Sequence, residues 1–96
     1  MVLEALVLHT KDNVATAVRH LEKDKRIPLK DGGNDTDVLL IQTIPFGHKF
    51  ALRDIEPGEK IIKYGEVIGQ ATKRIEKGEH VHVHNVEGLR GRGDRQ

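Results

Sequence analysis

Histidines alternate with valines near the end of the chain, in the sequence Gly-Glu-His-Val-His-Val-His-Asn at residues 78–85. Successive side chains of a β-strand point to opposite faces, so a strand here would place His80, His82 and His84 on one face and the two valines on the other. Alternate Cα atoms of a strand are ~6.7 Å apart, which lets two neighbouring imidazoles tilt toward one metal ion at about 2.0 to 2.1 Å from each nitrogen. Three imidazoles on a straight strand cannot easily converge.

The metal interpretation of this segment is therefore one histidine pair with further ligands from elsewhere in the chain. The remaining histidine would be free for proton transfer or substrate contact. Imidazole suits zinc, iron and other transition metals alike. The alternative is a solvent-exposed strand whose polar face is built from histidine and has no role in chemistry.

A second candidate site lies in Phe-Gly-His-Lys-Phe at residues 46–50. The glycine lets the backbone approach a ligand closely. Imidazole exchanges protons near neutral pH, so His48 is a candidate acid or base, and the ammonium of Lys49 can hold an anionic carboxylate. The alternative is a solvated pair at the start of a strand. His9 and His20 stand alone in the sequence and are assigned no role.

The first part of the chain must supply the scaffold for these residues. Residues 3–9 are mostly apolar and predict an opening strand. Further on, Val14, Val18 and Leu21 follow the i, i+4, i+7 spacing of an amphipathic helix. This spacing predicts one helix at residues 13–23.

Two kinds of turn follow. Residues 26–30 and 37–43 predict a hairpin, because the Asp-Gly-Gly-Asn sequence between them tolerates the positive φ of a tight reversal. Asp-Ile-Glu-Pro-Gly-Glu-Lys-Ile at residues 54–61 then recurs as Arg-Ile-Glu-Lys-Gly-Glu-His-Val at residues 74–81. The repeat predicts one glycine-containing turn, used twice, that leads into a strand.

Short strands with glycine bends are expected around these turns, at residues 49–53, 60–64 and 66–72. The polar, glycine- and arginine-rich residues 87–96 predict a flexible or partner-ordered tail. The sequence thus predicts one domain at residues 1–86, mainly β with one α-helix.

Composition excludes several classes of protein. Sixteen Lys and Arg residues against 15 Asp and Glu, with the signs interspersed, leave no one-sign surface for a nucleic-acid backbone. The absence of cysteine excludes disulfides, zinc-finger sites and a thiolate nucleophile. No apolar run approaches the ~20 residues of a membrane span. We therefore expect a cytoplasmic protein that binds neither nucleic acid nor membrane.

In their order and spacing, four blocks resemble the SAF-type domain of the altronate/galactarate dehydratase family. They are Gly-His-Lys-Phe-Ala-Leu at 47–52, Ile-Lys-Tyr-Gly at 62–65, Ile-Gly at 68–69 and the histidine-rich segment at 78–85. The resemblance implies a β-clip fold. In the family this domain precedes a large catalytic region, and small chains of this type are similar to the small subunits of two-subunit lyases such as sulfolactate sulfo-lyase. It therefore implies a large catalytic subunit as partner and a divalent metal, iron or manganese.

The chemistry that the resemblance implies is β-elimination of water or sulfite from a hydroxy or sugar acid, which gives an enol and then a 2-oxo acid. A metal would stabilise the developing charges while a general base takes the proton. The roles carried over are catalysis for His48 and Lys49, substrate binding for Lys49, His80 and Asn85, and metal binding for His82 and His84.

We therefore expect the accessory subunit of a hydroxy-acid dehydratase, inactive or nearly so when alone; homo-oligomers are compatible with this. Fold does not fix function, so two alternatives stay open. One is a non-enzymatic module that binds a sugar acid, and the other is a metal-binding module whose histidine-rich strand is the entire site.

Overall fold

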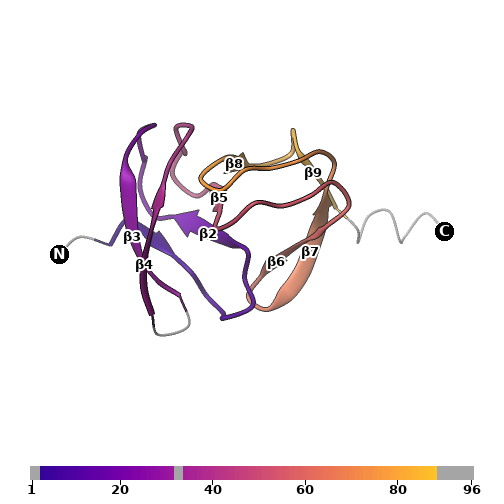
Figure 1. The fold of residues 1–96 in the computed structure, drawn as a ribbon, viewed down its shortest axis with the longest axis horizontal. Helices are drawn as coiled ribbons and strands as arrows, with labels where there is room; N and C mark the ends of the chain where they lie inside the picture. Colours follow the sequence, from indigo (N-terminus) through magenta and orange to yellow (C-terminus); the bar gives the residue numbers. More distant parts are fainter. Residues whose placement is uncertain (1–2, 32–33, 89–96) are drawn as a thin grey trace.

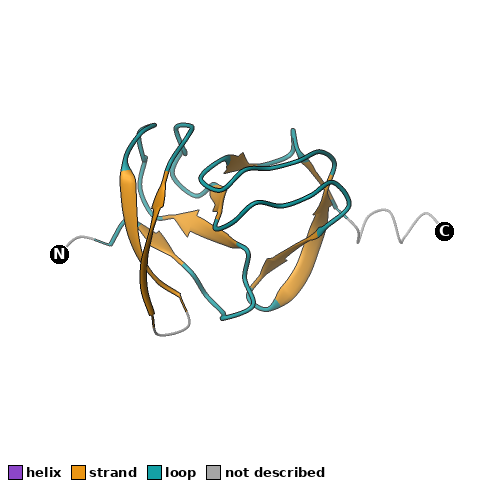
Figure 2. Cartoon of the chain, viewed as in Figure 1, coloured by secondary structure: helices purple, strands orange, loops and turns teal. Residues whose placement is uncertain are grey.

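The computed structural model describes residues 3–31 and 34–88, and every regular element within these ranges is a β-strand (Figure 1, Figure 2). The strands are β1 (Ala5–Leu6), β2 (Val14–Ala17), β3 (Arg26–Asp31), β4 (Asn34–Leu39), β5 (Lys49–Ala51), β6 (Lys60–Lys63), β7 (Glu66–Ala71), β8 (His80–Val81) and β9 (Val86–Glu87). The described part of the chain holds no helix long and apolar enough to cross a membrane. The predicted mainly β architecture is confirmed.

A four-stranded antiparallel sheet, in the order β1-β2-β5-β8, runs through the middle of the molecule. The β3–β4 hairpin lies on one side of it and the β6-β7-β9 sheet on the other (Figure 1). Because alternate residues of a strand point to opposite faces, the central sheet separates two cores. Ala15 and Phe50 belong to one core, whereas their neighbours Val14 and Ala51 belong to the other.

The predicted helix at residues 13–23 is wrong. Its first part is strand β2, and Leu21 forms an isolated antiparallel bridge with Ile44. Strand β2 lies between β1 and β5 and is covered on both faces, with three of its four residues at most 1% exposed. A strand buried on both faces carries a continuous apolar run instead of an alternating one, so the spacing of its apolar residues fitted a helix by coincidence.

The turn that the repeat predicts twice occurs four times in the described residues, three times with glycine and once with aspartate at its third position. Each copy closes with a backbone hydrogen bond from the fourth residue to the first: Lys25 to Glu22, His48 to Pro45, Glu59 to Glu56 and Glu79 to Glu76. The third residue of each turn has a positive φ: 73° at Asp24, 83° at Gly47, 85° at Gly58 and 85° at Gly78. The first copy cannot be recognised from the sequence repeat, because an aspartate occupies the position where this backbone conformation favours glycine.

The four copies pair two by two. Leu21 and Ile44 exchange backbone hydrogen bonds of 2.9 and 2.8 Å, and Ile55 and Ile75 exchange bonds of 2.7 and 2.8 Å. All four side chains are fully buried, so each pair closes one of the two cores. The chain is therefore built from two similar pairs of turns on either side of the central sheet.

The other predicted strands correspond to observed ones with shifted ends. The hairpin is confirmed as β3 and β4, paired up to Asp31 and Asn34, although β4 begins before and ends before the predicted strand at 37–43. The expected strands at 49–53, 60–64 and 66–72 are β5, β6 and β7. The opening strand is reduced to β1.

The end of the domain lies beyond the predicted boundary. Glu87, expected in the tail, forms β9 with Val86 and pairs with Gln70 and Ala71 of β7. The tail residues 89–96 lie outside the described ranges.

A buried polar side chain ties the two halves of the fold together. The Asn13 side-chain oxygen accepts a hydrogen bond from the Ile62 N–H, and its amide donates to the Lys60 carbonyl, both at 2.8 Å. Next to it, the Asp12 carboxylate accepts a 2.9 Å bond from the Gly65 N–H. These bonds fix the β6–β7 hairpin against β2, which sets one wall of the site described next.

Candidate functional site

The histidine-rich segment is a strand only at its start. His80 and Val81 form β8 and pair with β5, after which residues 82–85 form a turn. The predicted alternation of three histidines along one strand is therefore wrong beyond Val81. The turn forms because Asn85 bonds the backbone locally: its side-chain oxygen accepts from the His82 N–H at 3.0 Å, and its amide donates to the His80 carbonyl at 2.8 Å.

His48 reaches the same place from one of the repeated turns. Gly47 in that turn donates a 2.9 Å backbone bond to Ala17 of β2, and the His48 carbonyl accepts a 2.8 Å bond from the Ala17 N–H. The turn thus docks on β2 and delivers His48 to the start of β5, beside β8. His48 Nδ1 lies 2.8 Å from His80 Nε2, within hydrogen-bond distance.

The turn after β8 brings a third imidazole onto this pair. The ring of His82 stacks on that of His48 with centroids 4.1 Å apart, and lies 5.4 Å from the ring of His80. One nitrogen from each of the three rings lies within 4.8 Å of the other two. We call His48, His80 and His82 the histidine cluster; it joins the two segments that the sequence marked as separate candidates.

His84 lies at the edge of this cluster. Its ring is 5.2 Å from that of His80, tilted by 36°, and the residue is exposed. In the part of the chain that the structure describes, the group of side chains placed to hold a metal is His48, His80 and His82. The predicted metal pair of His82 and His84 is therefore not the set that the fold brings together, because the turn at 82–85 interrupts the strand.

Burial lowers the pKa of two of the three histidines in the cluster, His80 and His82. Desolvation, reinforced by the nearby His48, His84, His82 and Lys49, lowers the pKa of His80 from 6.5 to about 4. Desolvation and then His48 and Lys49 also lower the pKa of His82. A neutral imidazole has one nitrogen with a free lone pair, so His80 and His82 can each accept a proton or bind a metal ion.

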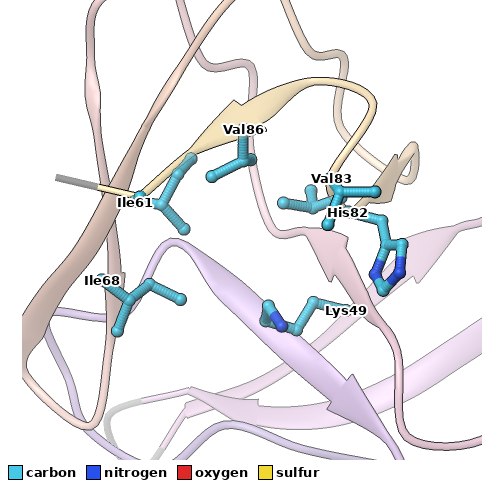
Figure 3. Close-up of a pocket in the computed structure, with 8 residues that line it drawn as sticks. Lys49, Ile61, Ile68, His82, Val83 and Val86 are labelled. Atoms are coloured by element: carbon cyan, nitrogen blue, oxygen red, sulfur yellow. The ribbon is translucent and has the colours of Figure 1, made fainter. Parts of the chain in front are cut away.

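Lys49 lies at a pocket next to the cluster. The pocket has a volume of about 240 Å³, and Figure 3 shows Lys49 and His82 at one end of it and Ile61 and Ile68 at the other. It is lined by Lys49, Ile61, Ile68, Val81, His82, Val83, Val86 and Gly88. Burial and then the charge of Lys63 lower the pKa of Lys49, so a carboxylate beside it would compensate both effects.

Asn85 is not at the open face of the site. It is 0% exposed and its oxygen and amide both bond the backbone of the turn. The family resemblance implies substrate binding by Asn85, whereas the structure buries its side chain and bonds it to the backbone of His80 and His82. Its side chain sets where these two histidines point.

Three further residues around the cluster carried no signal in the sequence. The Gln42 side-chain oxygen accepts a 3.0 Å bond from the His80 N–H. Val83 and Phe46 are 82% and 70% exposed and stand one and two residues from the cluster in the chain.

The sequence matches the family model described as the altronate/galactarate dehydratase SAF domain over residues 3–89. The strands and the histidine cluster therefore define a domain of SAF type. The chain belongs to the altronate/galactarate dehydratase SAF-domain family, as the four sequence blocks predicted.

The curated relatives include long enzymes and a small subunit. The chain is 40% identical over 84 residues to altronate dehydratase of Escherichia coli (strain K12), which covers 88% of this chain and 16% of the relative. It is 45% identical over 73 residues to galactarate dehydratase (L-threo-forming) of the same organism, covering 74% of this chain and 13% of the relative. It is 54% identical over 44 residues to (2R)-sulfolactate sulfo-lyase subunit alpha of Chromohalobacter salexigens, covering 46% of this chain and 47% of the relative.

These relatives place the chain in a dehydratase- and lyase-associated family. The chain spans about a sixth of the altronate dehydratase and about half of the sulfo-lyase subunit alpha.

Proposed function

We propose that this chain is the small, SAF-domain subunit of a lyase that eliminates water or sulfite from a hydroxy or sugar acid to give a 2-oxo acid, together with a large catalytic subunit. The family match over residues 3–89 supports the lyase class. The printed name of the sulfo-lyase relative, a subunit alpha, supports division of the enzyme between two chains.

The observation that carries this proposal is the placement of the histidine cluster beside Lys49. The elimination needs a group that binds a carboxylate and a base that takes the proton from the carbon next to it. Lys49 supplies the first at one end of the pocket, and the imidazoles of the histidine cluster supply the second.

The bonds of the reaction balance without any redox partner. The C–H bond at the carbon next to the carboxylate breaks, and its proton goes to the base. The C–O or C–S bond at the neighbouring carbon breaks, hydroxide or sulfite departs with its electron pair, and a C=C bond forms. The resulting enol then tautomerises to the 2-oxo acid: the carbon that lost the leaving group takes up a proton, and the enol hydroxyl releases one.

We assign His48 as the acid or base and Lys49 as the carboxylate-binding residue. His48 is half-buried and its Nδ1 faces His80 Nε2, so the second imidazole can hold or pass on the proton. His82 lies at the same pocket as Lys49 and can contact the substrate. Asn85 acts as a positioning residue for His80 and His82.

The test is reconstitution with a large dehydratase-like chain, if one is encoded next to this one. The chain alone should release no 2-oxo acid, whereas the two chains together should turn over a hydroxy acid. His48→Gln should lower kcat by about 100-fold or more, the range for removing one acid or base. Lys49→Met should mainly raise KM.

The exposed His20 supplies the matched control, since His20→Gln changes one imidazole on the surface and should leave turnover unchanged. Turnover by the chain alone, or a complex indifferent to both His48→Gln and Lys49→Met, would contradict the proposal. Tight binding of a sugar acid by the chain alone, without turnover in any complex, would instead identify a non-enzymatic binding module.

A further inference from the structure

We propose that His48, His80 and His82 form a binding site for one divalent transition-metal ion, each through one imidazole nitrogen, and that His84 is not a ligand. The family resemblance implies a different pair, His82 with His84. All three proposed ligands belong to this chain. Metal binding therefore does not depend on a large subunit. The site uses the same histidines as the proposed function, so His48 acts as the acid or base only while its imidazole nitrogen holds no ion.

The spacing of the nitrogens supports the site. One nitrogen from each ring lies within 4.8 Å of the other two, and His48 Nδ1 and His80 Nε2 are 2.8 Å apart. Nitrogens held about 2.0 to 2.1 Å from one tetrahedral ion are roughly 3.3 Å from one another. Metal binding therefore requires the nitrogens of His48 and His80 to move slightly apart and the nitrogen of His82 to move toward them.

The backbone of each ligand is already fixed, so these adjustments fall on the side chains alone. The His48 N–H donates to the Pro45 carbonyl at 3.0 Å. The His80 N–H donates to the side chain of Gln42, and the His82 N–H to that of Asn85, both at 3.0 Å. Such preorganisation lowers the entropy that binding must overcome.

The donor set also fits a transition metal. The group of candidate ligands found within residues 3–31 and 34–88 consists of three imidazoles without a carboxylate. Neutral imidazole suits zinc, iron, nickel and copper, whereas magnesium and calcium favour oxygen ligands. Three protein ligands with an open position is the arrangement of catalytic and not of structural metal sites.

His84 is excluded by its place at the far side of the turn. The turn at residues 82–85 directs it away from His48, and its ring contact is with His80, at 5.2 Å. Asn85 enforces this geometry through its bonds to the backbone of His80 and His82. The segment at residues 80–84 therefore contains two proposed ligands, His80 and His82, and one histidine, His84, that is not a ligand.

The test uses the purified full chain after treatment with a chelator, without any partner. Titration with Co²⁺, followed by its visible absorption bands, and with Zn²⁺ in a calorimeter should each show one equivalent bound. His48→Ala, His80→Ala and His82→Ala should each weaken binding by about 100-fold or more, because losing even a group that only orients a ligand costs 10- to 100-fold. His84→Ala and His20→Ala should leave the affinity unchanged.

Circular dichroism of each variant in chelator separates lost ligands from lost folding, and His80→Gln replaces His80→Ala if the latter is unfolded. Failure of the wild-type chain to bind one equivalent would overturn the site. Loss of binding in His84→Ala, with binding retained in His48→Ala, would overturn it in favour of the strand pair. Neither result bears on whether a large subunit forms a lyase, so the two proposals fail separately.

Discussion

At the scale of single residues, two buried asparagines hold the molecule in the shape that the site requires. Asn13 and Asn85 are both 0% exposed, and each uses its side-chain oxygen and amide on backbone groups. A buried polar group that loses its partner costs far more than the net gain of one hydrogen bond. These residues are therefore structural, although their type and position in the sequence suggested ligand contacts for one of them.

Replacing Asn85 by alanine should destabilise the fold by about 1–3 kcal/mol, because the His82 N–H and the His80 carbonyl both lose their partner. Urea unfolding of the chelator-treated chain measures the change. The exposed Thr72 supplies the control, since Thr72→Ala should stay within about 0.5 kcal/mol of the parent. A change of that small size in Asn85→Ala would contradict the assigned bonding.

The low pKa of His80 predicts a loss of stability in mild acid for the metal-free chain. The unfolded chain takes up a proton near the ordinary pKa of 6.5, whereas the folded chain does so only at about 4. Between these values the unfolded state binds more protons, so the free energy of unfolding should fall as the pH falls from 6.5 to about 4.

Urea unfolding in chelator at several pH values in this window measures the slope, and His80→Gln, which cannot titrate, should reduce it. A slope that is the same in the wild-type chain and in His80→Gln would show that His80 is not the group responsible.

At the scale of elements, the sequence predicted correctly those elements whose conformation depends on neighbouring residues. The pairing of β3 with β4 and the last two repeated turns could be predicted from the sequence, and in these two turns Gly58 and Gly78 supply the positive φ. Strand β2 could not be predicted from its local sequence, because the spacing of its apolar residues also fits a helix. It is a strand because it is buried between β1 and β5.

The candidate site was likewise predicted only in part. The sequence marks out His48 and the histidine-rich segment, but not that they meet, because their contact depends on the pairing of β5 with β8. The ending of β8 at Val81 depends on a side chain four residues later, which a period-two pattern cannot register.

The repeated turns make a matched comparison possible. Gly58 and Gly78 have the same φ of 85°, yet a Cβ at Gly58 would meet nothing within 4 Å, whereas a Cβ at Gly78 would lie 2.1 Å from the Leu39 carbonyl oxygen. Gly58→Ala should therefore cost only the left-handed backbone strain, about 1–2 kcal/mol. Gly78→Ala should cost clearly more and shift the turn that leads into β8.

Thermal unfolding of both variants measures the difference, and backbone amide shifts of His80 and Val81 report the displacement. Equal destabilisation by the two substitutions would mean that the turn before β8 does not pack against Leu39 as described.

At the scale of the whole molecule, His82 of the cluster and two exposed apolar residues line one pocket. Ile68 and Val83 line it and are 40% and 82% exposed, and Lys49 adds positive charge at its end. Large apolar side chains beside a cation suit a partner that presents an apolar side chain and a carboxylate. In the proposed lyase, the large subunit would cover this face and thereby close the site.

Substitutions on this face should therefore disrupt the complex with the large subunit. Ile68→Asp and Val83→Asp should each weaken binding at least about tenfold, because they place a carboxylate against an apolar contact and reverse the local charge. Leu6→Asp is the matched control: Leu6 is 37% exposed and lies on β1, at the opposite edge of the central sheet from β8. Calorimetry with the large chain measures all three. Loss of binding in Leu6→Asp alone would show that the interface lies at the β1 edge of the sheet. A wild-type chain that forms no complex would contradict the two-subunit proposal itself.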